Sequence, residues 1–218
     1  MRCRPPHVQF ARHGYHHGNL KEALIAAARR LIAEHGPQGF TLNEASRTAG
    51  VSPSAPYRHF RDRNALIEAT AEEGFNLFRD RLLASAEGVV TPYEALHRMG
   101  AAYYAFALDE PGFYQAMFSS GLPAVGAPVT AAGDRAFMVL ENAVRALGAQ
   151  EHQVRALAIK IWAFTHGMTG LIASGSVSPL EAGRLAGDAV DAMLRDSGIA
   201  VPSKEPGRDG EETRPHVS

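Results

Sequence analysis

The chain has almost no cysteine, since Cys3 is the only one among its 218 residues. A single thiol cannot form an internal disulfide, which agrees with a reducing compartment. The sequence also lacks any uninterrupted apolar run near the ~20 residues that a membrane-spanning helix needs. Its first residues carry charge but no apolar signal-peptide segment. We therefore expect a cytoplasmic protein with no membrane partner.

The motifs of common catalytic sites are missing as well. We find no glycine-rich phosphate loop, no nucleophile elbow and no Cys–His spacing typical of a metal site. His13, His16 and His17 lie close together, but we interpret them as part of a solvated N-terminal segment. The sequence therefore predicts neither an enzyme, nor a metal site, nor a cofactor.

Charge is distributed unevenly along the chain. Residues 1–63 contain ten Lys and Arg against four Asp and Glu, a net +6. The remainder has twelve against nineteen, a net −7, so the overall charge of −1 conceals the difference. A basic N-terminal part can bind a polyanion, whereas an acidic remainder cannot. This asymmetry indicates a module that meets nucleic acid.

Almost every segment has helical periodicity, and no segment alternates convincingly like a strand. In "NLKE", Asn19 can cap a first helix that Gly36 and Pro37 end, and in "TLNE" Thr41 can cap a second helix that ends at Gly50. A longer helix is predicted over residues 63–87, followed by further helical segments to about residue 198. We therefore expect an all-α protein.

The segment "VSPSAPYRHF" combines two prolines with aromatic and basic residues. Ser52 can serve as an N-cap and Pro53 suits the first helical position, where its missing N–H is not needed. Pro56 removes a further N–H within the first turn, so we expect a slightly irregular start. The sequence therefore predicts a third short helix over residues 53–60, with Ser54 and Ala55 in its first turn.

Two short helices joined by "AGVS" form a helix-turn-helix pattern, a unit that places its second helix in the DNA major groove. Gly50 can adopt the positive φ that the turn requires. Hydroxyl, guanidinium and imidazole groups at the second helix can reach phosphates and base edges. The predicted DNA-contacting residues are Thr41, Ser52, Ser54, Ala55, Tyr57, Arg58, His59 and Arg63.

Residues 15–66 closely resemble the DNA-binding domain of the TetR family of bacterial transcriptional regulators. The resemblance is carried by "GFTL" at the second helix, "AGVS" as the turn and "YRHF" in the recognition segment. Arg63 stands where many members have lysine, and Pro56 stands where many have a small or aliphatic residue. Further along, "WAFTHGMTGLIASG" resembles the Trp…His-Gly pattern of one subgroup of C-terminal domains. The resemblance implies an all-α homodimer with an N-terminal three-helix DNA-binding domain and a C-terminal helical domain for effector binding and dimerisation.

The last two predicted helices are rich in small residues on apolar faces. Small residues permit close approach of helices, and two such helices from each subunit can form a four-helix dimer interface. An ordinary intramolecular helix pair would use the same pattern. The residues predicted for the dimer interface are Gly167, Leu171, Leu185, Ala189 and Met193.

Aromatic residues and methionines are concentrated between the two ends of the chain. An apolar cavity with a few polar groups is what a small-molecule site requires, although plain core packing explains most such residues individually. The residues predicted to line an effector pocket are Tyr103, Phe106, Met117, Phe137, Trp162 and His166.

These patterns predict four parts: a basic N-terminal arm (1–16), a helix-turn-helix domain (17–62), an effector-binding and dimerisation domain (63–198) and a disordered tail (199–218). The expected function is a transcriptional regulator, a repressor released from a palindromic double-stranded operator by a small apolar or aromatic effector of unknown identity. The alternative is a helical protein–protein adaptor that does not bind DNA.

Overall fold

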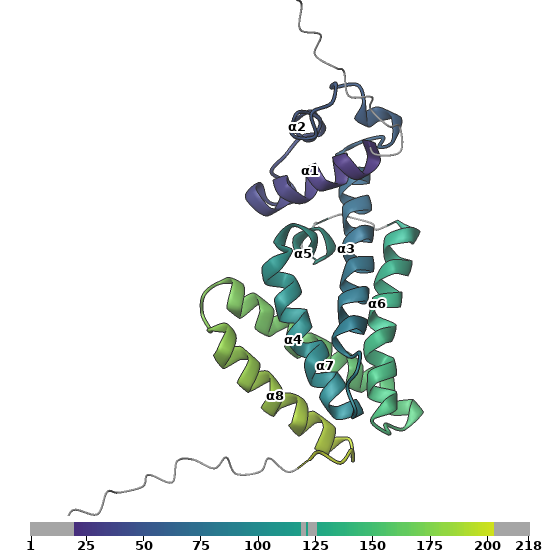
Figure 1. Cartoon of the computed structure of the whole chain (residues 1–218), viewed down its shortest axis with the longest axis vertical. Coiled ribbons are helices and arrows are strands. Elements are labelled where there is room, and N and C mark those ends of the chain that lie inside the picture. The colour runs from purple at the N-terminus through teal and green to yellow at the C-terminus, as the bar shows by residue number, and fades with distance from the viewer. Residues whose placement is uncertain (1–19, 119–120, 122–125, 203–218) are drawn as a thin grey trace, which may run out of the picture. The chain divides into compact units, whose positions relative to one another are not determined.

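The computed structural model describes residues 20–118, 121 and 126–202, and every regular element within these ranges is a helix (Figure 1). The all-α prediction is therefore confirmed. The predicted arm (1–16), Asn19 as a helix cap and most of the predicted tail lie outside the described residues. The helices are α1 (Leu20–His35), α2 (Leu42–Thr48), the 3₁₀-helix η1 (Pro56–Arg58), α3 (Arg63–Ser85), α4 (Pro92–Asp109), α5 (Pro111–Phe118), α6 (Ala127–Ala146), α7 (Glu151–Ala173) and α8 (Pro179–Asp196).

Local signals place several helix ends where the sequence predicts them. Gly36 and Gly50 have φ values of 75° and 70°, so each supplies the left-handed turn that ends a helix. At the start of α8, the Ser178 hydroxyl accepts a hydrogen bond from the Glu181 N–H, and Pro179 occupies the first turn. These ends follow from residues within one turn of each boundary.

The described helices belong to two compact units. The first comprises Met1–Ser85 with Ala102–Val139, and therefore holds the helix-turn-helix segment together with α3, the end of α4, α5 and most of α6. In it, α1 packs against α2, η1, α3 and α5, and α3 also packs against α5. The core of this unit contains Leu24, Ala28, Ile32, Leu66, Ile67 and Phe106, all buried.

Two glycines allow α5 to approach its neighbours closely. A Cβ at Gly112 would lie 2.0 Å from the backbone oxygen of Arg29 in α1. A Cβ at Gly74 in α3 would lie 2.9 Å from the sulfur of Met117 in α5. Close-packed interiors do not absorb such overlaps without movement. The spacing between α5 and α1 depends on Gly112, because a Cβ there would meet a backbone atom of Arg29, which cannot rotate away as a side chain can.

The second unit comprises Ala86–Ala101 with Leu140–Ser218, and α7 packs against α8 in it. The carboxylate residue Asp191 of α8 is buried in this unit, with 2% of its surface exposed. The Tyr93 hydroxyl donates to Asp191 Oδ1 at 2.8 Å, and His97 Nε2 lies 3.1 Å from the same oxygen. The beginning of α4 is thus attached to α8 through one carboxylate.

Helix α7 is notable for its apolar composition. By length and hydropathy alone it could cross a membrane, a property that packed helices of globular proteins share. Residues exposed on it include Ile159, Trp162 and Leu171. An apolar helix with an exposed apolar face indicates a surface for association.

Candidate nucleic-acid interface

Helix α2 begins with the capping box that the sequence predicts. The Glu44 N–H donates to the Thr41 hydroxyl at 3.2 Å, while the Thr41 N–H donates to Glu44 Oε2 at 2.8 Å. Hydrogen bonds from the Thr41 side chain and backbone lower the pKa of Glu44. The Thr41 hydroxyl also donates to this carboxylate at 2.9 Å. Thr41 is a predicted DNA contact, but its N–H and its hydroxyl both donate to Glu44 in this structure.

The predicted third helix over residues 53–60 is wrong in extent and in type. Only Pro56–Arg58 is helical, as a 3₁₀ turn whose N-cap is Ala55 rather than Ser52. The Ala55 N–H donates to Ser52 O at 3.0 Å, and the Arg58 N–H donates to Ala55 O at 3.2 Å. These bonds span three residues, as in 3₁₀ geometry. Because Pro56 has no N–H, the four-residue bond of an α-helix to Ser52 O cannot form.

Buried residues at both ends hold this short segment on the protein. Pro56 is fully buried and Phe60 is 3% exposed, and η1 packs against α1. Between them Tyr57, Arg58 and His59 are exposed, with Tyr57 at 59%. The buried residues on either side fix the segment to the protein, so the three side chains between them project into solvent. The segment is therefore built to present these three side chains.

The structure brings several predicted DNA-contacting residues together around one hollow of about 560 Å³. Its lining comes from the first residue of α1, from the turn and from the 3₁₀ segment. Ser52, Ala55, Arg58 and His59 contribute to it, whereas Tyr57 does not. Ser52 and Ser54 are exposed, and their hydroxyl oxygens lie 3.3 Å apart. The hollow is lined by Leu20, Gly50, Val51, Ser52, Ala55, Arg58 and His59.

Arg63 lies at the start of α3, and its guanidinium is bonded to the loop before α2. Its Nη1 donates to the backbone oxygen of Gln38 at 3.1 Å and to that of Phe40 at 3.4 Å. Its Nη2 also donates to the Gln38 side-chain oxygen. These bonds tie α3 to the loop before α2, so a phosphate would have to share this side chain with three protein oxygens.

Arg47 is an exposed cation of the helix-turn-helix unit that was not among the predicted contacts. Arg47 lies in the last turn of α2 and is exposed, on the helix that precedes the turn. Because the first helix of a helix-turn-helix crosses the DNA backbone, exposed arginines on it suit phosphates. A helical projection of residues 42–48 could have found it, since Leu42 and Ala45 define the opposite, buried face.

The predicted effector-pocket residues are divided between the two units. Tyr103 and Phe106 are buried in the first unit, and each ring centroid lies 5.1 Å from that of Phe78 in α3. Met117 is half-buried against Gly74, and Phe137 is half-buried on α6 of the same unit.

Trp162 and His166 lie on α7 in the second unit, with ring centroids 5.8 Å apart. Burial lowers the pKa of His166 below its usual value of 6.5, which favours the neutral imidazole at pH 7. A neutral imidazole on a partly apolar surface can offer one donor or one acceptor to a ligand.

The predicted dimer-interface residues all leave surface uncovered in the single chain. Leu171 is 44% exposed and Leu185 is 37% exposed, while Gly167 is also exposed. Ala189 and Met193 are half-buried. Apolar side chains left accessible on two packed helices form a surface that a second copy could cover.

The described structure defines an all-α protein with a capped helix-turn-helix unit near its N-terminus. Residues 24–70 match the family model described as "Bacterial regulatory proteins, tetR family". Residues 96–196 match the model "Tetracyclin repressor-like, C-terminal domain". The chain therefore belongs to the TetR family of transcriptional regulators. Its members are transcription factors without enzymatic activity, which agrees with the expectation from the sequence.

Similar proteins support the same assignment. The chain is 32% identical over 102 residues to the HTH-type transcriptional regulator BetI of Rhizobium meliloti (strain 1021), covering 45% of this chain and 50% of that protein. It is 34% identical over 70 residues to the HTH-type transcriptional repressor Rv1474c of Mycobacterium tuberculosis, covering 32% of this chain and 36% of the repressor. The chain thus spans about half or less of these relatives. A solved protein of unknown function from Rhodococcus sp. RHA1 superposes with a TM-score of 0.73 at 29% identity, over 86% of this chain and 98% of that one.

Proposed function

We propose that this protein binds a palindromic DNA operator as a homodimer and represses transcription there. The observation that carries the proposal is the exposed run Tyr57–Arg58–His59, held between buried Pro56 and buried Phe60. An arginine and an imidazole can donate to phosphates or guanine, and a tyrosine hydroxyl suits a phosphate oxygen. The net +6 of residues 1–63 adds a favourable field for a polyanion.

A dimer follows from the small size of the reading segment. One 3₁₀ turn reaches few base pairs, so specificity requires a second copy at a half-site about 34–36 Å away or a multiple of that distance. The accessible face of α7 and α8, with Leu171 and Leu185, is the surface that we assign to the dimer. Repression rather than activation is supported by the repressor named among the relatives.

Release from the operator is assigned to a small apolar or aromatic effector. The pair Trp162–His166 on α7 is partly accessible and supplies ring faces and one imidazole that such a ligand could contact. An effector acts by binding the DNA-incompetent arrangement more tightly than the competent one. The effector should therefore bind the free dimer more tightly than the operator-bound dimer.

Selection of bound sequences from random duplex DNA tests the proposal and supplies the operator. The wild-type protein should enrich a palindrome, and its affinity should fall steeply with salt as counterions are released. Arg58→Ala and Tyr57→Ala should each weaken operator binding by about 1–3 kcal/mol, measured by gel shift. Arg98→Ala is the matched control, because Arg98 is an exposed arginine on α4, outside both proposed interfaces, with a 54% exposed side chain.

The adaptor alternative makes the opposite prediction for the same experiment. An adaptor should enrich no sequence, and Arg58→Ala should then change DNA binding no more than Arg98→Ala does. Either result would contradict the proposed function, provided that circular dichroism shows the variants to be folded.

A further inference from the structure

Glu110 lies at the junction between α4 and α5. Its N–H donates to Phe106 O at 2.9 Å, which closes the last turn of α4, and its carbonyl oxygen accepts from the Tyr114 N–H at 2.9 Å, which opens α5. The residue therefore belongs to both helices, and any change in the angle between them moves its side chain.

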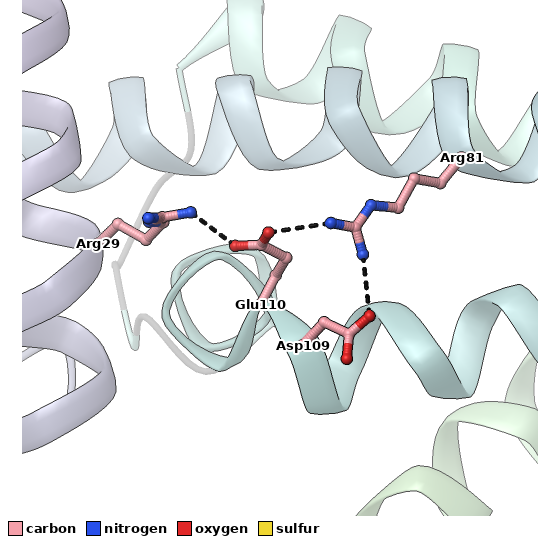
Figure 2. Close-up of polar contacts among 4 residues, drawn as sticks. All are labelled: Arg29, Arg81, Asp109 and Glu110. Atoms are coloured by element: carbon pink, nitrogen blue, oxygen red, sulfur yellow. Dashed lines mark hydrogen bonds and ion pairs between the residues drawn. The ribbon is translucent and has the colours of Figure 1, made fainter.

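The two oxygens of the Glu110 carboxylate bind arginines from two different helices (Figure 2). Oε2 accepts from Nη1 of Arg29 in α1 at 2.7 Å, and Oε1 accepts from Nη2 of Arg81 in α3 at 2.9 Å. Arg81 also reaches Asp109 Oδ2 at 3.4 Å. One carboxylate thus joins α1, the first helix of the DNA-binding segment, to α3, the helix that follows that segment.

Aromatic rings hold the two arginines in place. The Arg29 guanidinium lies 5.3 Å from the Phe113 ring centroid, and that of Arg81 lies 5.5 Å from the centroid of Phe106. Both distances suit a cation–π interaction. Phe106 precedes Glu110 on α4, and Phe113 follows it on α5. Each arginine therefore contacts one aromatic ring and one carboxylate oxygen from the junction of these two helices.

The pairing is sheltered enough to fix a geometry. The Glu110 side chain is 15% exposed, whereas those of Arg29 and Arg81 are 43% and 34% exposed. Ion pairs made by a partly buried carboxylate, with a cation on each oxygen, are stronger and more directional than an exposed ion pair. An amide in its place would turn an NH₂ group toward one of the two guanidinium groups, and so would lose that pairing.

The direction of α1 governs the DNA-reading segment, because α1 packs against both α2 and η1. Leu20, its first residue, lines the same hollow as Arg58 and His59. A rotation of α1 on α3 and α5 would therefore carry the reading side chains with it. In a dimer, such a rotation changes the distance between two reading segments.

We propose that Glu110 is a positioning residue for DNA reading, which sets the half-site spacing that the dimer accepts by fixing α1 on α3 and α5. The inference rests on the proposed function, since it requires a dimer on a two-part operator. It predicts that loss of the Glu110 carboxylate alters the choice between spacings more than the affinity for one half-site.

The test uses the full chain and the operator selected by the wild-type protein. Affinities are measured for that operator, for duplexes with the spacer shortened or lengthened by one base pair, and for a single half-site. The variants are Glu110→Gln and the matched control Glu94→Gln, which breaks the exposed Glu94–Arg98 pair of 2.7 Å on α4. The readout is the ratio of affinities between spacings, because a smaller folded fraction lowers all affinities together and leaves the ratio unchanged.

The wild-type protein and Glu94→Gln should share one strong spacer preference, and Glu110→Gln should weaken that preference by about fivefold or more. Its single half-site affinity should stay within about twofold of wild type. Arg29→Gln should reproduce the effect, and the double variant Arg29→Gln/Glu110→Gln should be no worse than either single variant, because both remove the same link.

An unchanged spacer preference in both Glu110→Gln and Arg29→Gln would overturn the inference, while the proposed function would stand. If the wild-type protein itself enriches no DNA, the proposed function fails first. A uniform loss of affinity at every spacing with an unchanged ratio would show a purely structural role for Glu110, and would also overturn the inference.

Discussion

Two sheltered carboxylates, one in each unit, hold helices together with different partners. Glu110 in the first unit is shared by Arg29 and Arg81, one on each carboxylate oxygen. Asp191 in the second unit accepts from the neutral Tyr93 hydroxyl and lies beside His97, with Arg195 farther away at 3.9 Å. The first junction is built from two guanidinium groups, and the second is built mainly from a phenol and an imidazole.

The two carboxylates also differ in how deeply they are buried. The side chain of Asp191 is 3% exposed, and that of Glu110 is 15% exposed. A group cut off from water costs more when its partners are lost, because no solvent replaces them. The second unit should thus depend on its carboxylate for stability, whereas in the first unit the carboxylate serves mainly to set direction.

The largest predicted effect comes from removing each carboxylate in turn. Asp191→Ala should lower the free energy of unfolding by about 3 kcal/mol, because the Tyr93 hydroxyl and His97 lose their shared acceptor and a cavity remains. Glu110→Ala should cost about 1 kcal/mol, since both arginines can turn to solvent. Urea denaturation at a fixed protein concentration measures both values. An equal or larger loss for Glu110→Ala would reverse the comparison.

Two glycines sharpen the comparison at the level of packing. Gly112→Ala should destabilise the protein by about 1–3 kcal/mol, because the new Cβ meets the Arg29 backbone oxygen, and backbone cannot turn away. Gly187→Ala in α8 is the matched control, since its Cβ would lie 3.9 Å from the nearest atoms, those of the His97 ring. That change should stabilise the helix by about 0.5–1 kcal/mol. Thermal unfolding of the two variants gives opposite shifts if the packing is as described.

The last predicted effect concerns pH and belongs to the second unit alone. Burial, reinforced by the hydrogen bond to Asp191, raises the pKa of Tyr93 from 10.0 to about 12. A raised pKa in the folded state means that the stabilising contribution is complete below pH 10 and is lost as pH rises through about 12. Tyr93→Phe should therefore cost about 1.5 kcal/mol from pH 6 to pH 9.

Above pH 10 the difference between wild type and Tyr93→Phe should shrink. Comparing the two proteins across the range removes the contributions of other tyrosines and lysines, which titrate in both. A difference that stays constant up to pH 12 would show that the Tyr93 proton does not stabilise the fold.

Features that depend on neighbouring residues could be predicted from the sequence. The Thr41–Glu44 capping box spans three residues, and its cap, its reciprocal bonds and the start of α2 are confirmed. The start of α3 at Arg63 is confirmed as well. The extent of the third helix was wrong, because Pro56 has no N–H to donate to Ser52 O and the segment forms a 3₁₀ turn instead.

Features that join distant parts of the chain could not be predicted. Glu110 is separated from Arg29 by 81 residues and from Arg81 by 29, so no local pattern links the three. Arg63 is likewise 25 residues from Gln38, and the sequence suggested only a phosphate contact for it. The packing of α1, α3 and α5 decides these pairings, and one sequence alone does not reveal it.

Around η1, buried and exposed residues alternate. This arrangement assigns folding stability and DNA recognition, two requirements that usually compete during evolution, to different residues. Pro56 and Phe60 contribute to stability, while exposed Ser52, Ser54 and Arg58 contribute little to it. If the segment reads DNA as proposed, substitutions at those exposed positions would change the preferred DNA sequence with little effect on folding. Relatives that keep the same anchored segment could diverge onto new promoters by single, stability-neutral steps.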